Sequence, residues 1–357
     1  MFLLIESFLL WKPVPFRVPI PRGLPTKTLP GESSHFASPC MKLALAKEII
    51  ACLPAGRTLF HYTKDDYAFL LLDLMRSKTP RLHELRRSRV GRLLEKPTIK
   101  SFLSQCPSGD LSSADLPRRQ YHRDGRAYRL SLDLWGEDLD YWKSNQVSRK
   151  GVSLVLQLNM PQSHFRRLQR CLIDPDDTPF DYYSHPTRND RNPTLAWCRL
   201  DVDLDSREAL IEEIQTDMLR DYREAMSDAR TARKKGERIF DWYGFEFRTN
   251  HLIYYWDDEF SSHEKTWHEA ILTAALEFLV DELGMKTIYY HTAESGRILK
   301  RISGNTPPVS LYSSLPKKFC FEQTAEAPDI LSRESHWKRR LRSSPRPFEF
   351  FRLAVLA

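Results

Sequence analysis

The sequence lacks the short motifs that identify several large classes of enzyme. It contains no P-loop or Gly-x-Gly-x-x-Gly pattern for a nucleotide, and no Ser-His-Asp pattern of a nucleophilic hydrolase. The cysteines are scattered, and none has the spacing of a zinc site or of a disulfide framework: Cys40, Cys52, Cys106, Cys171, Cys198 and Cys320. We therefore expect free thiols in a reducing cytoplasm.

Apolar runs long enough to cross a membrane are also missing. The apolar segment at residues 1–11 is too short to span a bilayer and includes Glu6. Residues 12–40 are rich in proline and should not pack. We interpret residues 1–40 as a disordered or wrongly included extension before a working protein that starts at Met41, and we expect no membrane association.

The chain is long enough for a substantial core, and its overall charge is basic. It has 357 residues, 41% of them hydrophobic and 28% charged, and a formal net charge of +7. Much of the positive charge lies in residues 82–96 and 336–344. A nucleic acid or an acidic protein is therefore a candidate partner, although basic runs are more often solvated surfaces.

The pattern of apolar residues divides the chain into four regions. After the extension, residues 41–125 predict a mainly helical region, 126–325 a mixed α/β core domain, and 326–357 a basic tail. Within these regions we predict helices at 42–53, from Asp65, within 82–105 and at 163–172. We predict strands at 57–63, 127–135 and 151–160.

The next part of the chain predicts antiparallel strands. Residues 194–205 and 209–217 alternate polar and apolar side chains around a short polar turn, which is typical of a hairpin. A charged helix over residues 218–235 follows and ends at Gly236.

The segment from residue 251 to residue 296 predicts a strand, a long helix and another strand. We place the strands at 251–256 and 286–291, and expect both to extend a parallel part of the sheet that begins with 209–215. The helix between them starts at a Ser261/Glu264 capping box and stops at Gly284. The predicted fold class is therefore α+β, with a mixed sheet whose antiparallel strands come first and whose parallel β-α-β unit comes last.

Polar residues collect at the predicted carboxyl ends of the parallel strands, where ligands usually bind. The candidate catalytic residues are Glu213, Gln215, Asp217, His268, His291 and Glu294. His268 falls inside the apolar arc of the first helical turn, where the helix dipole favours a neutral ring. A buried carboxylate needs a partner, so we expect Glu212 or Glu213 to pair with an arginine or a ligand; for any single acid a structural salt bridge is the simpler interpretation.

Three short segments resemble an uncharacterised group of bacterial proteins and, more distantly, parts of phage and mobile-element polyproteins. They are IEEIQTD at 211–217, KTWHEA at 265–270 and HTAESG at 291–296, and a fourth block, SLYSSLPKKFCF at 310–321, is shared with closer members of the group. The resemblance covers about a third of the chain and implies no established activity.

The order of strands and helix also resembles the core of the Gcn5-related acetyltransferases. In that family the pyrophosphate of acyl-coenzyme A binds at the start of the helix after the fourth strand, which implies acetyl-CoA as cofactor and places it at Ser262, Lys265 and Thr266. The glycine-rich loop of the family is missing here. Residues 59–63 resemble the His-x-Thr strand of ADP-ribosyltransferases, but the other motifs of that family are not evident.

These observations leave three functions open. The first is an enzyme of acyltransferase-like architecture with a histidine or carboxylate as general base. The second is a binding protein, phage- or defence-associated, that contacts nucleic acid or protein through its basic segments, including Arg81–Arg92 and Lys338–Arg342. The third is a phosphoryl-transfer enzyme with a divalent cation held by Asp217, Asp257, Glu259 and His291.

Overall fold

The computed structural model describes most of the chain from Met41 onward. The described residues are 41–52, 59–75, 82–105, 116, 125–136, 146–180, 182, 185–188, 192–302, 308–333, 337 and 348–356. The predicted extension at 1–40, Arg81 and the basic stretch 338–342 lie outside them. No helix in the described ranges is both long and apolar enough to cross a membrane.

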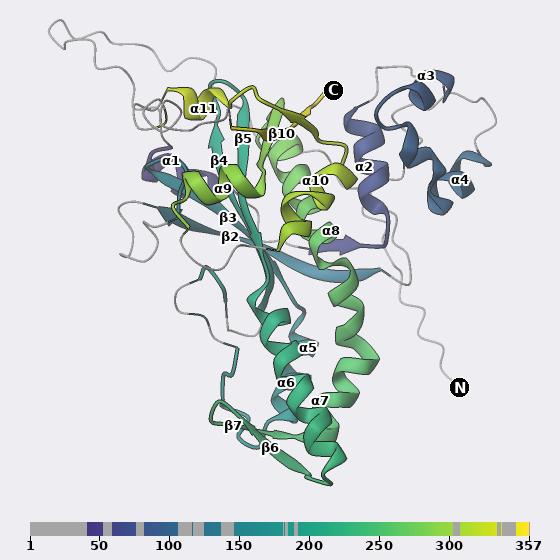
Figure 1. Ribbon diagram of the computed structural model, residues 1–357, viewed down its shortest axis with the longest axis vertical. Coiled ribbons are helices and arrows are strands. Elements are labelled where there is room, and N and C mark those ends of the chain that lie inside the picture. Colours follow the sequence, from purple (N-terminus) through teal and green to yellow (C-terminus); the bar gives the residue numbers. More distant parts are fainter. Residues whose placement is uncertain are drawn as a thin grey trace, which may run out of the picture.

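One mixed sheet of eight strands organises the fold (Figure 1), in the order β1-β2-β3-β4-β5-β8-β10-β9. Its strands are β1 (Leu59–Tyr62), β2 (Arg126–Gly136), β3 (Val152–Asn159), β4 (Thr194–Asp203), β5 (Glu208–Gln215), β8 (Thr287–His291), β9 (Glu322–Thr324) and β10 (Phe350–Ala354). A separate hairpin pairs β6 (Ile239–Trp242) with β7 (Phe245–Arg248). Because β1 and β10 belong to the large sheet, the core extends beyond the predicted boundaries at 126 and 325.

Helices cover both sides of this sheet and form a separate lobe. They are α1 (Leu43–Ala51), α2 (Asp66–Leu74), α3 (Leu82–Arg87), η2 (Gly91–Glu95), α4 (Pro97–Leu103), α5 (Gln162–Cys171), α6 (Asp217–Lys234), α7 (Thr249–Tyr255), η4 (Trp256–Phe260), α8 (Ser261–Glu277), η5 (Phe278–Glu282), α9 (Ala293–Leu299), η6 (Val309–Tyr312), α10 (Ser314–Lys318) and α11 (Asp329–Ser332). Here η2 and η6 are 3₁₀ helices, and η4 and η5 are π-helical.

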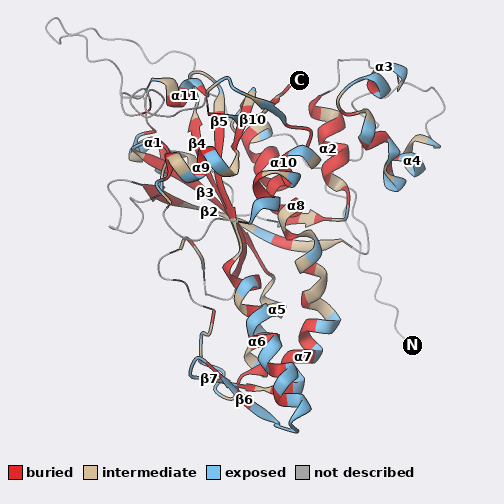
Figure 2. Ribbon diagram, in the orientation of Figure 1, coloured by how far each residue is buried: buried red, intermediate tan, exposed pale blue. Residues whose placement is uncertain are grey.

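The predicted mixed sheet is confirmed, including its antiparallel beginning. Strands β1 to β5 pair antiparallel in sequence, and β4 with β5 forms the predicted hairpin. Strand β8 then pairs parallel to β5 over 208–211 and 287–290. Alternate residues of this pair enter two apolar clusters, Ile211 and Tyr290 on one side and Leu210 and Tyr289 on the other. The centre of the sheet is therefore covered on both faces, as Figure 2 shows by its buried strands.

The predicted strand at 251–256 is wrong, because these residues are helical. A continuous helix runs from Thr249 through α7, η4 and α8 to the end of η5. Its first turns bury Leu252, Ile253, Tyr255 and Trp256 and expose Tyr254. Apolar positions at i, i+1, i+3 and i+4 fit the period of a helix, not the alternation of a strand.

The two ends predicted for the long helix have different outcomes. Ser261 and Glu264 do not form a cap, since the helix has already begun twelve residues earlier, and Glu264 instead pairs with Arg223 on α6 at 2.6 Å. The stop at Gly284 is confirmed. Gly284 has φ of +69°, and the amide of Met285 bonds back to the carbonyl of Leu279 at 2.9 Å.

The connection from β5 to β8 builds a lobe that extends away from the sheet (Figure 1). Helix α6 runs outward, the β6–β7 hairpin turns the chain, and α7 leads back into α8, with α5 alongside. Aromatic rings fill the lobe: Phe180 packs 4.5 Å from Tyr222, and Tyr222 packs 4.2 Å from Phe260 between ring centroids. These contacts explain why an amphipathic segment with strand-forming aromatics is helical here.

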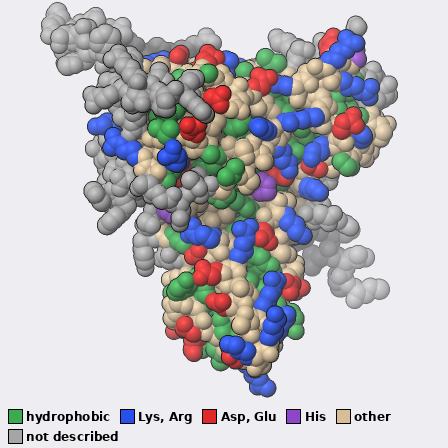
Figure 3. Space-filling view, viewed as in Figure 1, with side chains coloured by type: hydrophobic (Ala, Val, Ile, Leu, Met, Phe, Trp, Pro, Cys, Tyr) green, Lys and Arg blue, Asp and Glu red, His purple; other side chains and the backbone are tan. Residues whose placement is uncertain are grey.

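Part of the predicted basic surface serves the fold instead. Arg89 donates to the carbonyl of Ala354 at 3.0 Å and pairs with Glu322 at 3.0 Å, and Arg92 contacts the sulfur of Cys320. These arginines fasten the N-terminal helices to β9 and β10. On the face drawn in Figure 3, Asp and Glu side chains lie among the Lys and Arg side chains.

A buried histidine, His263, connects the lobe to the sheet, and the half-buried His164 packs against it. His263 of α8 lies 2.8 Å from the hydroxyl of Tyr128 on β2, and His164 of α5 lies 2.9 Å from the hydroxyl of Tyr255 on α7. The two imidazole rings meet edge to face with centroids 5.0 Å apart. Burial lowers the pKa of both histidines, that of His263 to about 3.

These histidines should make the protein less stable in acid. Below pH 6.5 the unfolded chain protonates His263 while the folded chain keeps it neutral, so the free energy of unfolding falls as pH decreases toward the folded pKa of about 3. At pH 5 this one histidine should cost about 2 kcal/mol. Urea unfolding at pH 7.5 and pH 5.0 measures the loss, which His263→Phe should reduce. An exposed control, His83→Phe, should change nothing; equal acid sensitivity in both variants would contradict the assignment.

Candidate functional site

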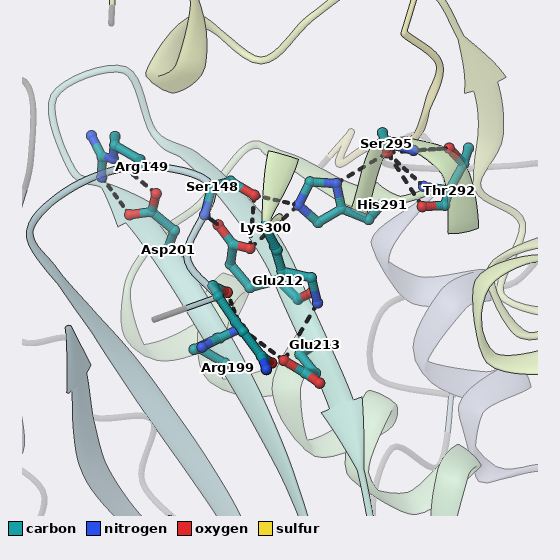
Figure 4. A network of polar contacts seen from close by, with 11 residues as sticks. Ser148, Arg149, Arg199, Asp201, Glu212, Glu213, His291, Thr292, Ser295 and Lys300 are labelled. Atoms are coloured by element: carbon teal, nitrogen blue, oxygen red, sulfur yellow. Dashed lines mark hydrogen bonds and ion pairs between the residues drawn. The ribbon is translucent and has the colours of Figure 1, made fainter. Parts of the chain in front are cut away.

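A β-bulge places two consecutive glutamates in one buried network (Figure 4). Arg199 pairs with Glu213, but the next residue of β4, Leu200, pairs with Ile211, so Glu212 is the extra residue of β5. A bulge re-aims side chains that would otherwise alternate between faces. Both carboxylates therefore point into the same network, which lies at the end of the β5–β8 ladder.

Two cations hold Glu213 and the open edge of β5. Parallel pairing with β8 ends at Ile211, and beyond it Lys300 donates to the main-chain oxygen of Glu212 at 3.0 Å and lies 3.4 Å from the carboxylate of Glu213. Arg199 donates to the same carboxylate at 2.7 Å and to the carbonyl of Gln146 at 2.6 Å. Lys300 and Arg199 have side chains only 1% exposed. The predicted pairing of a buried glutamate with an arginine is confirmed.

His291 completes the network on the side of Glu212. Its Nε2 lies 2.9 Å from Ser148 Oγ and 3.3 Å from Glu212 Oε2, and Ser148 Oγ lies 2.9 Å from the same carboxylate oxygen. Its Nδ1 lies 3.0 Å from Ser295 Oγ. Burial lowers the pKa of His291, whereas the donors and cations around Glu212 hold the pKa of that carboxyl below its ordinary value despite burial.

The positions of the protons decide what this triangle can do. An ionised Glu212 only accepts, so the single hydroxyl proton of Ser148 must point to it. The contact of His291 Nε2 with both oxygens then requires a hydrogen on Nε2, with Nδ1 accepting from Ser295. Because that nitrogen has no lone pair toward Ser148, it cannot remove the hydroxyl proton, and Ser148 is not an activated nucleophile.

The loop that carries Ser148 is fixed by a second buried ion pair. Arg149 donates Nε to Asp201 Oδ2 at 2.8 Å, and its Nη2 contacts the other carboxylate oxygen. Burial raises the pKa of Asp201 to about 6, against the pull of Arg149. The interior network is thus a set of mutually satisfied charges with almost no exposure.

A second cluster at the end of β5 reaches the surface. Asp217, the first residue of α6, accepts from Trp197 Nε1 at 3.2 Å, from Arg220 Nη2 at 3.2 Å and from the side-chain amide of Gln215, and its Oδ2 lies 2.8 Å from His185 Nδ1. Its side chain is fully buried, whereas that of His185 is 31% exposed. Burial acts to raise the pKa of Asp217, but the hydrogen bonds from His185, Trp197 and Gln215 outweigh it and lower that pKa.

The Asp217–His185 pair brings a partly exposed imidazole within 2.8 Å of a buried carboxylate, the distance that an acid–base dyad needs. His185 Nδ1 lies 2.8 Å from Asp217 Oδ2 and 3.2 Å from the side-chain nitrogen of Gln215. When the ionised carboxylate, the nearer of the two, takes the hydrogen of Nδ1, the lone pair of a neutral His185 lies on Nε2. That nitrogen bonds to no side chain or carbonyl within the described ranges, and the ring is partly exposed. His185 can therefore accept a proton from a bound molecule, while Asp217 stabilises the imidazolium.

The structure brings some of the predicted site residues together. Glu213 and Gln215 lie at the end of β5, Asp217 is the first residue of α6, and His291 lies beside Glu212 at the end of β8. Glu294 is exposed in the first turn of α9 and only complements the helix dipole there. Two of the three predicted strand ends, 213–217 and 291–296, thus contribute residues to these clusters, whereas residues 256–259 are helical.

His268 belongs elsewhere, and the reason given for its neutral ring is wrong. It lies in the middle of the continuous helix, far from any helix start, next to Glu269 at 4.0 Å. Glu269 itself accepts from the hydroxyl of Tyr62 at 2.8 Å and pairs with Lys318. This cluster joins α8 to β1 and α10. Burial, and not the dipole, lowers the pKa of His268.

The predicted cofactor contacts are also wrong in their physical basis. Ser262, Lys265 and Thr266 lie within the continuous helix, so their amides are not free to hold a phosphate. The hydroxyls of Ser262 and Thr266 bond to the carbonyls of Glu259 and Ser262, and Lys265 is exposed. The helix that actually follows β5 is α6.

The four residues of the predicted metal site are separated. Asp257 pairs with Arg230, which is thirteen residues after Asp217 on α6 and thus about 20 Å along the helix axis. Glu259 pairs with Arg167, and His291 with Glu212. Among the described residues, no three His, Cys, Asp or Glu side chains are grouped to hold a metal ion.

Sequence reasoning missed His185, Trp197, Arg199 and Lys300. His185 lies in a polar loop with no periodic pattern. Trp197 and Arg199 lie on β4, where the alternation of polar and apolar side chains gives no sign of a special role. No protein-family model, curated protein or solved structure matches this chain. The chemistry of the site is therefore interpreted from its own geometry.

Removing one cation from the interior network should destabilise the fold strongly. Lys300→Met leaves Glu213 with one cation and the main-chain oxygen of Glu212 without its donor, so the free energy of unfolding should fall by about 3–5 kcal/mol. Denaturant unfolding measures it. Lys265→Met, which removes an exposed lysine, should change stability by less than about 0.5 kcal/mol. Adding Glu213→Gln to Lys300→Met should recover part of the loss; equal effects of the two lysine variants would contradict the network's role.

Proposed function

We propose that this chain is an enzyme of acyltransferase-like architecture, in which His185 acts as general base and Asp217 orients it. The observation that carries the proposal is the 2.8 Å contact between the partly exposed imidazole and a fully buried carboxylate. A salt bridge at an exposed surface would leave both partners solvated and would need no further donors. Here three other side chains fix the carboxylate, as an acid–base group requires.

The acyltransferase assignment is supported by the order of the elements. Strands β2 to β5 are antiparallel, a helical connection follows, and β8 joins parallel to β5 over only four residues before the strands separate. The resemblance to Gcn5-related acetyltransferases also included a strand at 251–256, which is helical, so the proposal keeps only the antiparallel strands, the helical connection and the parallel strand as its support. The dyad lies at the carboxyl end of β5, where open α/β sheets usually bind ligands.

The proposed reaction moves an acyl group from a thioester to an acceptor that carries an N–H or O–H. His185 Nε2 takes the proton from the N–H or O–H of the acceptor while the nitrogen or oxygen of the acceptor bonds to the acyl carbon. The C–S bond breaks, and the thiolate leaves and is protonated by the imidazolium. The resemblance makes acetyl-CoA the first donor to test. It is not assigned as the cofactor, because the first turn of α6 has Asp217 at the place where a glycine-rich loop would hold pyrophosphate.

The proposal predicts acyl transfer that depends on the dyad. The full chain should be stabilised against heat by acetyl-CoA or another acyl thioester, and should release free thiol in the presence of small amines or alcohols. His185→Gln and Asp217→Asn should each lower the rate by about 100-fold or more, because proton removal is lost or the ring is no longer oriented. The matched control is His83→Gln, an exposed histidine on α3.

Two results would overturn this function. One is the absence of both heat stabilisation and thiol release with a panel of acyl thioesters. The other is full activity in His185→Gln.

A further inference from the structure

Trp197 lies between the interior network and the proposed catalytic dyad. Its Nε1 points to Asp217 Oδ2 at 3.2 Å, the same oxygen that accepts from His185 Nδ1 at 2.8 Å. Its indole stacks on Trp135 with a centroid distance of 6.5 Å and an interplanar angle of 13°. The guanidinium of Arg199 lies 5.1 Å from the Trp135 ring centre.

The indole is suited to fix the direction of the carboxylate. Trp197 is 2% exposed and has a single donor, so its hydrogen bond has no competition from water. Arg220 and Gln215 bond to the other carboxylate oxygen, Oδ1. Apart from His185, Trp197 is therefore the group that fixes the direction of Asp217 Oδ2.

We infer that Trp197 is a positioning residue of the dyad, which aims Asp217 Oδ2 at His185 and thereby selects the imidazole tautomer with its lone pair on Nε2. This inference rests on the proposed function only for its catalytic meaning; the tautomer itself can be measured without an activity. The ring of His185 also packs between Trp197, at 5.8 Å, and Tyr182, at 6.4 Å. The side-chain nitrogen of Gln215 lies 3.2 Å from His185 Nδ1 and can only donate to it, so loss of the tryptophan donor would favour the tautomer with hydrogen on Nε2.

The interior network supports this role indirectly. Arg199 cannot move far, since it is held by Glu213 and the carbonyl of Gln146, and its guanidinium covers Trp135. Trp135 in turn supports the flat face of Trp197. Arg199, two residues after Trp197 on β4, therefore connects the closed cluster of charges to Trp135 and gives the Trp197 indole a rigid support.

The test compares two tryptophan variants in the full chain by ¹⁵N-histidine NMR at pH 8. Wild type should show His185, assigned with His185→Gln, with hydrogen on Nδ1 and the lone pair on Nε2. Trp197→Phe keeps an aromatic ring but removes the donor, and should shift His185 to an averaged mixture of both tautomers. Trp135→Phe keeps the hydrogen bond and should retain the wild-type tautomer.

A second readout follows Asp217 directly through its ¹³Cγ shift between pH 4 and pH 7. In wild type the lowered pKa should keep the carboxyl ionised over this range, whereas Trp197→Phe should begin to titrate. If Trp197→Phe does not fold, benzothienylalanine at position 197 replaces the N–H by sulfur with little change in shape. A wild-type tautomer in the variant without the donor, or equal changes in both tryptophan variants, would overturn the inference. Failure of acyl transfer alone would overturn only the proposed function.

Discussion

The fold depends on the neutralisation of charge at the point where β5 leaves β8. A strand that continues without a neighbour has unpaired main-chain groups, and in the interior these need partners. Lys300 supplies one by donating to Glu212, and its charge is balanced by Glu213, which also holds Arg199. Each of these buried charges would be costly alone, so the strand end, the bulge and helix α9 are tied to one another.

This constraint explains why the recognised segments of the sequence belong together. The IEEIQTD segment supplies Glu212, Glu213 and Asp217, and the HTAESG segment supplies His291 and Ser295. The two segments are far apart in the chain but adjacent in the sheet. The third segment, KTWHEA, has a different task, because Glu269 binds Tyr62 and Lys318 and so connects the edge of the sheet to α10.

The sequence predicted well those features that depend on neighbouring residues. Alternation defined the β4–β5 hairpin, and the glycine with positive φ defined the end of the long helix at Gly284. It failed at residues 251–256, where aromatic and β-branched residues favour a strand locally. The packing of Tyr222 against Phe260 inside the lobe stabilises the helix at residues 251–256. These two residues are too far apart in the sequence for a local pattern to reveal their contact.

The same distinction holds for the site. The need of a buried glutamate for a cation follows from elementary electrostatics, so an arginine partner could be predicted. Which arginine it is depends on the register of β4 against β5, and the bulge at Glu212 changes that register by one residue. His185 could not be found, since only the fold brings its irregular loop to the start of α6.

His291 and His185, which both lie beside the end of β5, show that the exposure of a histidine decides whether it can exchange protons with a ligand or only supports the fold. His291 and His185 each contact a buried carboxylate, at 3.3 Å and 2.8 Å. In His291 both ring nitrogens are engaged and the side chain is fully buried, so a change of its proton would leave a charge or a lone pair without compensation. Among the described residues, the polar contacts of His185 are all made by Nδ1, so Nε2 can accept a proton from a molecule outside.

In the proposed function, Asp217 lowers the free-energy cost of protonating His185. Its carboxylate is already ionised and fixed by donors that remain in place whether or not the ring carries a second proton. The imidazolium would therefore form next to a charge that needs no rearrangement, which is the condition for efficient proton transfer. The closed network serves the open one by keeping the strand, the tryptophan pair and the first turn of α6 in a single arrangement.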